Sequence, residues 1–322
     1  MKRLAAYDNA RGILILQVVL GHVLTYANPE WRIKPYVALY MLVTCFHMSA
    51  FFLLSGMLFN GEKWRQRGWG AFLLQKARTL LLPYLFFELV GIAYLHFVLG
   101  AVSLREGFLR MLTLRCNVGA DWFLPAMFLA DLLNYARIRY LPRDRKGQWI
   151  GAFLAGLCLF STWVMPKGTP FDSLTRALLG FAFMVFGSLL RKPLERHSLR
   201  KTLVSFLLSA GFAALTFKFA ANDFYGCRVS DPPLFLLCGL AGTSLVLGLG
   251  HGIRWRPLAW LGEHSIVVMG THQLALYTLP ASSCPLWVAG TFALILALEL
   301  PLIWLLDRYL PFFIGKTRKK AA

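Results

Sequence analysis

Long apolar stretches alternate with short basic segments along the whole 322-residue chain. A helix that crosses the hydrocarbon core of a bilayer needs about 20 mainly apolar residues. Windows of that size can be drawn ten times, near residues 10–27, 36–59, 82–101, 122–140, 149–166, 173–190, 202–221, 233–250, 261–280 and 286–306. The apolar runs are continuous rather than alternating, which excludes a β-barrel. The pattern therefore predicts an all-α fold, a polytopic integral membrane helix bundle with about ten transmembrane helices.

The basic residues between these windows predict the orientation of the chain. If the N-terminus is cytoplasmic, the inner segments hold 25 of the 34 Lys and Arg residues, as the positive-inside rule requires. An even number of spans then returns the C-terminus to the cytoplasm. We expect a multi-pass protein of the cell inner membrane, with one membrane-embedded domain over residues 1–315 and a basic cytoplasmic tail over 316–322.

Composition removes several classes of protein. The chain is 57% hydrophobic and 15% charged, which no ordinary soluble domain matches. In a soluble domain the net charge of +19 would suggest nucleic acid, but here it follows from topology, so we expect membrane lipids and no nucleic acid as partners. Cysteines and histidines form no close cluster, and no metal is expected. Cys116, Cys227 and Cys284 fall in predicted outer loops, which leaves one disulfide among them open.

One segment between the second and third windows has a different pattern. In residues 69–81, apolar positions are interleaved with Lys76 and Arg78, and Pro83 follows shortly afterwards. This pattern predicts a short amphipathic helix on the cytoplasmic surface that ends before the proline.

The first window carries two ionisable residues, Arg11 and His22. They are eleven residues apart, which is close to three helical turns, so both face the same side with about 16 Å between them. A polar residue within a membrane helix is a functional-site hypothesis by default. The alternatives are that Arg11 anchors to lipid phosphate and that His22 only hydrogen-bonds to a neighbouring helix.

His47 and His272 are expected at a similar depth in the membrane to His22, about halfway along their own windows. Three unrelated core histidines at one depth would be a coincidence. The unperturbed pKa of histidine, near 6.5, lets the side chain take and return a proton at neutral pH. This is the property that a general base needs.

Asp121 and Trp122 stand at the predicted outer end of the fourth window, with Phe123 beside them. They are candidates for binding an acceptor sugar, although a tryptophan there also fits the aromatic belt at a membrane interface. Glu88 is a weaker candidate for lining a cavity, because a hydrogen bond between helices explains it equally well.

Five segments of the chain form recognisable motifs: YDNARGILILQVVLGH with Arg11 and His22, FHMSAFFLLSG with His47 and Ser55, KARTLLLPY with Lys76 and Arg78, DWFLPAMFLADLL with Asp121 and Trp122, and LGEHSIVVMGTHQ with His272. Together they resemble the acyltransferase-3 family of integral membrane acyltransferases, in its fucose O-acetylase-like branch. They occur in family order over about 260 residues. One departure is FLADLLNYA in the fourth span, where many relatives have a Glu followed by Phe-Tyr.

The resemblance implies O-acylation of a cell-envelope carbohydrate, most often with acetyl-CoA as acyl donor. Its anionic phosphates would meet Arg11, Lys76 and Arg78 at the inner face, and the pantetheine arm would reach toward His22. His22 would act as general base, with Arg11 and His47 also in the catalytic group.

For the remaining residues the resemblance implies supporting roles. Ser55 would contact the donor, and either His47 or Ser55 would orient the base or stabilise the oxyanion. Asp121, Trp122 and His272 would contact the carbohydrate acceptor.

Two other classes remain open. Ten spans with buried histidines and mid-helix glycines also suit a secondary transporter or a flippase for lipid-linked glycans. Such a protein would show inverted repeats and would move substrate without consuming acyl-CoA. A non-catalytic membrane scaffold leaves the alignment of Arg11 with His22 unexplained.

Overall fold

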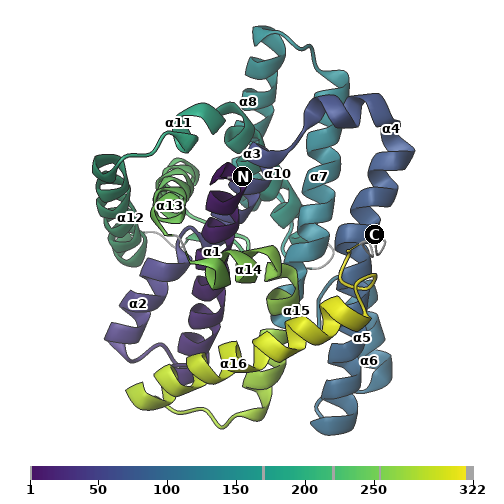
Figure 1. Ribbon diagram of the computed structural model, residues 1–322, viewed down its shortest axis with the longest axis vertical. Coiled ribbons are helices and arrows are strands. Elements are labelled where there is room, and N and C mark those ends of the chain that lie inside the picture. Colours follow the sequence, from purple (N-terminus) through teal and green to yellow (C-terminus); the bar gives the residue numbers. More distant parts are fainter. Residues whose placement is uncertain (1, 169–170, 220–221, 254, 317–322) are drawn as a thin grey trace.

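The computed structural model describes residues 2–168, 171–219, 222–253 and 255–316, and it is almost entirely helical (Figure 1). Most of the predicted basic tail therefore lies outside the described residues. The α-helices are α1 (Lys2–Ala27), α2 (Lys34–Thr44), α3 (His47–Leu58), α4 (Gly61–Lys76), α5 (Leu82–Ala93), α6 (Leu104–Leu112), α7 (Phe123–Tyr140), α8 (Arg145–Leu159), α9 (Ser161–Val164), α10 (Phe171–Leu189), α11 (Arg191–Glu195), α12 (Leu199–Phe219), α13 (Pro232–Gly252), α14 (Arg256–Glu263), α15 (Ser265–Thr278) and α16 (Pro285–Tyr309). Shorter elements are the π-helical turns η1 (Ala77–Leu81) and η2 (Tyr94–Val98), the 3-10 turn η3 (Gly119–Trp122), and the antiparallel strands β1 (Asn222–Asp223) and β2 (Arg228–Val229).

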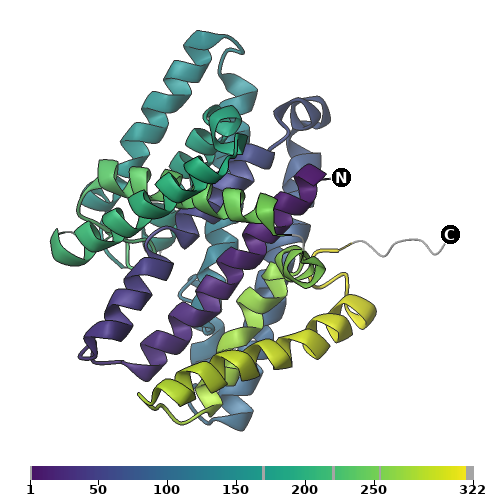
Figure 2. The same cartoon turned by 60° about the vertical axis from the view of Figure 1, so that its left-hand side comes forward.

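Helix α1 runs through the middle of the molecule and is surrounded by α2, α13, α14 and α15 (Figures 1 and 2). Its closest packing is against α14. A methyl group on Gly12 would overlap the Leu258 carbonyl, and one on Gly262 would overlap the Asp8 carbonyl. The backbones of α1 and α14 therefore approach each other closely at both glycines. Small residues at helix interfaces allow this kind of close packing in membranes.

Seven helical segments among the described residues are long and apolar enough to cross a membrane. Two of them, α12 and α16, are buried within the molecule over only a small share of their length. Their exposed leucines and aromatic residues fit a lipid-facing position, since soluble proteins rarely expose such large apolar faces. The protein is a multi-pass membrane protein. The three remaining windows correspond to α7, α8 with α9, and α14 with α15, so the count of ten spans stays a prediction.

Besides the window 149–166, which divides into α8 and α9 at Phe160, two windows that the sequence predicts as continuous helices are interrupted. The window 36–59 divides into α2 and α3 at Cys45 and Phe46, where Phe46 has φ −131° and ψ −11°. The window 261–280 divides into α14 and α15 at His264. No proline or glycine stands at either break, so local propensity could not predict them. The first break makes His47 the opening residue of α3.

The surface helix predicted over 69–81 is wrong as a separate element. Helix α4 continues through η1 into α5 and η2 as one long helical stretch, with a kink at Gly68, where φ is +75°. Pro83 does not end this stretch. It lies in the first turn of α5, directly after the π-helical turn η1. A proline is tolerated in the first turn of an α-helix, because the N–H group that it lacks has no partner within the helix there, and the π-helical turn has widened the backbone before it.

Candidate active site

A cavity of about 590 Å³ lies in the middle of the bundle, and it is named the central cavity here. Its walls come from α1, the junction of α2 and α3, η3, α15 and the hairpin formed by β1 and β2. His22 and His47 both line it, as do Trp122 and Gln273. Segments that are far apart in the sequence therefore meet at one site, within the size range of small-molecule pockets.

His22 lies on α1 and is held by a glutamine from α15. Gln273 Nε2 lies 2.9 Å from His22 Nδ1 and 3.5 Å from His22 Nε2. The other end of this amide, Oε1, accepts a hydrogen bond of 2.8 Å from the backbone N–H of Ala120 and a longer one from the hydroxyl of Tyr277. The glutamine thus connects the histidine to η3.

His47 is positioned by the helix break. Its Nδ1 lies 2.6 Å from the carbonyl oxygen of Thr44, the last residue of α2. Carbonyl oxygens accept only, so Nδ1 carries the proton. For Nε2 there is no hydrogen-bond partner within the described residues.

His272 is fully buried and does not line the central cavity. Its ring centroid lies 5.1 Å from that of His22. Nδ1 is 2.5 Å from the carbonyl of Val268 one turn earlier, and Nε2 is buried without a partner. The three histidines that the sequence predicts at one depth thus lie in the same region of the bundle, but only His22 and His47 line the central cavity.

The outer wall of the central cavity is aromatic. Trp122 packs against Phe224 and Tyr225 of the hairpin, with ring centroids 5.7 and 5.9 Å apart. The Arg176 guanidinium lies over both Trp122 and Tyr225 and donates from Nε to the Tyr225 carbonyl at 2.8 Å. Asp223, at the end of β1, is exposed and also lines the cavity.

Alternate carbonyls of the hairpin are held by donors from the segment 163–176. Besides Arg176 at the Tyr225 carbonyl, Lys167 donates to the Cys227 carbonyl and Trp163 to the Val229 carbonyl, both at 2.7 Å. Burial raises the pKa of the Cys227 thiol to about 11, which keeps it neutral. All six cysteines, including the three predicted in outer loops, are free thiols.

Asp121 stands behind this wall rather than in it. Its side chain is fully buried, and neither carboxyl oxygen has a hydrogen-bond partner in the described part of the chain. The loop before it is held by Glu88, whose carboxylate accepts from the backbone N–H groups of Asn117 and Val118 and from the Asn117 side chain. Glu88 thereby fixes η3, which carries Gly119, Ala120 and Trp122 into the cavity wall.

The predicted donor-binding cations lie outside the central cavity, toward the predicted inner face. Arg11 is partly exposed and 3.5 Å from Asp8. Lys76 forms an ion pair of 2.8 Å with Asp131, and the Arg78 guanidinium lies over the Phe312 ring. Ser55, on α3, does not line the cavity either.

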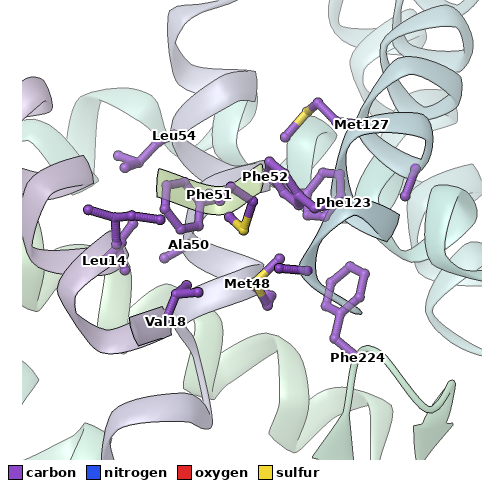
Figure 3. Packing of buried hydrophobic residues seen from close by; sticks show 14 of the residues in the cluster. Leu14, Val18, Met48, Ala50, Phe51, Phe52, Leu54, Phe123, Met127 and Phe224 are labelled. Carbon is purple, nitrogen blue, oxygen red and sulfur yellow. The ribbon is translucent and has the colours of Figure 1, made fainter. Parts of the chain in front are cut away.

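A packed apolar layer separates Arg11 from the central cavity. Figure 3 shows Leu14 of α1 beside Phe51 and Leu54 of α3, and all three are buried. Val18 and Met48 then form the inner end of the cavity. In this conformation the route predicted for the pantetheine arm is closed by side chains over part of its length.

Gln273 is one of the site residues that the sequence analysis did not predict. A signal was present, since it is an uncharged polar residue next to His272 in an apolar window. The contribution of the η3 backbone and of Tyr40, Asp223 and Tyr225 had no comparable signal, because only the fold brings them to the cavity.

Comparison with known proteins adds an independent line of evidence. A family model described as "Acyltransferase domain", that of the acyltransferase-3 family, matches residues 4–308. The chain is 32% identical over 155 residues to a nodulation protein NolL from Mesorhizobium japonicum, covering 45% of this chain and 38% of the relative. It is 35% identical over 137 residues to a nodulation protein NolL from Sinorhizobium fredii, covering 40% of this chain and 35% of the relative. The matches thus span less than two fifths of the length of these relatives. No solved structure matches.

Proposed function

We propose, because the chain belongs to the acyltransferase-3 family, that this membrane acyltransferase moves an acyl group, most often acetyl from acetyl-CoA, to a hydroxyl of a cell-envelope carbohydrate. The observation that carries the proposal is the central cavity itself. Two histidines and an aromatic wall line one space within a membrane helix bundle. Such a space holds a hydroxyl and a thioester together near a proton acceptor, away from bulk water.

The acceptor enters from the aromatic side of the cavity. Aromatic side chains with a polar end suit a ligand that is part apolar and part polar, as a sugar is, and Trp122 and Tyr225 line the cavity together with Asp223. Asp121 and His272 support this wall and the His22 ring from behind. The acceptor is an envelope polysaccharide or its lipid-linked precursor.

The donor enters from the cytoplasmic side of the inner membrane. Acetyl-CoA is polyanionic, and the basic inner segments supply cations for its phosphates. Arg11 is partly exposed for this role, and the predicted topology assigns Arg78 to the same inner side of the membrane. The apolar layer at Leu14, Phe51 and Leu54 must then open for the thioester to reach the cavity.

A cavity histidine assists as general base. A hydroxyl is a poor nucleophile at neutral pH, and removal of its proton during attack contributes about 10²–10⁴-fold in rate. His22 is the base that the sequence predicts, and it lines the cavity together with His47.

The test is acyl transfer by purified protein in lipid nanodiscs. Acetyl-CoA and an envelope glycan fraction from a strain lacking this gene should give CoA release and a new acetyl ester detected by mass spectrometry. His22→Ala should abolish both, whereas His251→Ala, on α13 outside the cavity, should not. Glycan-dependent transport without CoA release would refute the proposal and favour a transporter or flippase.

A further inference from the structure

We infer that His47, rather than His22, is the proton acceptor, and that Gln273 holds His22 as a hydrogen-bond donor to the thioester carbonyl. This inference rests on the proposed acyl transfer and assigns the roles within it. It follows from which ring nitrogen of each histidine carries the proton, and hydrogen-bond partners decide that.

The orientation of the Gln273 amide is settled by Ala120. A backbone N–H can only donate, so the amide atom that it contacts at 2.8 Å must be the oxygen. The Tyr277 hydroxyl also approaches this oxygen. The –NH₂ end therefore faces His22, and it too can only donate.

His22 must then accept at Nδ1, where the amide nitrogen lies 2.9 Å away. A neutral imidazole that accepts at Nδ1 carries its proton at Nε2. The second approach of the amide, 3.5 Å to Nε2, is too long to compete. In this arrangement His22 presents an N–H group, which stabilises a negative oxygen but does not take a proton from a hydroxyl.

His47 has the complementary arrangement. Its Nδ1 donates to the Thr44 carbonyl at 2.6 Å, so the lone pair is on Nε2. This histidine lines the central cavity, and its Nε2 has no partner in the described residues. It therefore combines an oriented ring with a lone pair available to a substrate hydroxyl, as a general base requires.

His272 has the same protonation pattern but no access. Its Nδ1 donates to the Val268 carbonyl, and its Nε2 is enclosed behind His22. Because it does not line the cavity, it cannot touch a substrate. Of the three histidines, only His47 has both the lone pair and the access.

The transfer then proceeds with each atom accounted for. His47 Nε2 takes the hydroxyl proton while the hydroxyl oxygen bonds to the thioester carbonyl carbon. The carbonyl oxygen becomes an oxyanion and accepts from the Nε2–H of His22. The C–S bond breaks, the sulfur leaves with the electron pair, and it receives the proton held on His47. The products are the ester and free CoA.

Glutamine substitutions separate the two roles, because a glutamine side chain donates a hydrogen bond but accepts no proton at neutral pH. His22→Gln should keep kcat within about tenfold of wild type, whereas His22→Leu should lose about 10²–10³-fold, as for a lost oxyanion donor. His47→Gln should lose about 10²–10⁴-fold. Each variant is compared at equal amounts of monodisperse protein in nanodiscs.

Nuclear magnetic resonance of protein with ¹⁵N-labelled histidine rings reports the protonated nitrogen directly and does not depend on turnover. We expect His22 protonated at Nε2 and His47 at Nδ1, with signals assigned from the two Gln variants. Gln273→Glu should place a proton on His22 Nδ1, since a carboxylate accepts where the amide donated. If Gln273 only filled space, the protonated ring nitrogen of His22 would be the same in the wild type and in Gln273→Glu.

Three results would overturn the inference: a loss of 10²-fold or more in His22→Gln, near-normal turnover in His47→Gln, or a wild-type His22 ring protonated at Nδ1 alone. A wild-type protein that releases no CoA with any glycan fraction would instead refute the proposed function, while the ring-nitrogen spectra would still decide the protonation pattern.

Discussion

The buried ion pair between Lys76 and Asp131 decides whether this lysine binds the donor or holds the fold. The Asp131 side chain is 1% exposed and the Lys76 side chain 20%, and their charged atoms are 2.8 Å apart. The second carboxylate oxygen, Oδ1, has no partner in the described residues, so Lys76 supplies the compensation for this charge. Removing one member of a buried pair costs about 3–5 kcal/mol, because the other charge is left uncompensated.

We therefore expect Lys76→Met to lower the free energy of unfolding by about 3–5 kcal/mol. Methionine keeps an apolar stem similar to that of the lysine but removes Nζ, which lies 5.8 Å from the Phe59 ring centroid and 5.7 Å from that of Phe72, so loss of charge dominates the effect. Lys76→Met combined with Asp131→Leu should restore most of the lost stability, since an apolar pair of similar volume often replaces a buried ion pair at little cost.

The assay is reversible unfolding of purified protein by sodium dodecyl sulfate in mixed micelles, followed by tryptophan fluorescence. Lys63→Met is the matched control, because Lys63 is exposed on the same helix and should change stability by less than about 0.5 kcal/mol. A stable Lys76→Met variant would refute the structural role. A double variant with restored stability but a Michaelis constant for acetyl-CoA raised tenfold would return Lys76 to donor binding.

Three further predictions address the donor, the packing and the topology. Arg11→Ala should mainly raise the Michaelis constant for acetyl-CoA, with partial rescue by Lys, and an unchanged constant with lower turnover would remove Arg11 from phosphate binding. Gly56→Ala should cost about 1–3 kcal/mol in the same unfolding assay, because its methyl group would overlap the Met184 carbonyl on α10; unchanged stability would show that α3 and α10 can separate freely. A reporter that fluoresces only in the cytoplasm, fused after the last residue, should be bright, and a dark fusion on an inserted chain would contradict the predicted topology.

The sequence by itself determined the class of structure, because membrane insertion depends on length and apolarity, which are local properties. Continuous apolar windows predict helices, and seven of the ten windows match helices capable of spanning a membrane. The spacing of Arg11 and His22 also followed from helical geometry alone, since both residues lie on the uninterrupted α1.

Local pattern could not predict the interruptions. The break before His47 and the break at His264 have no proline or glycine, so tertiary packing must override helix propensity there. The Phe46 ring fills the space that Gly242 leaves open on α13, a long-range contact that no window of sequence contains. This break turns His47 into the first residue of a helix, with its Nδ1 against the Thr44 carbonyl.

The chemistry of the candidate site was decided by the tertiary structure. Residue types and depth in the membrane predicted His22, His47 and His272 as a group, but not which of them meets the cavity. The proton positions depend on Gln273 and on the backbone N–H of Ala120 in η3, which are 153 residues apart in the sequence. Hydrogen bonds between residues so far apart in the sequence form only when the helices have packed together. Nothing in the local sequence around one partner indicates the position of the other.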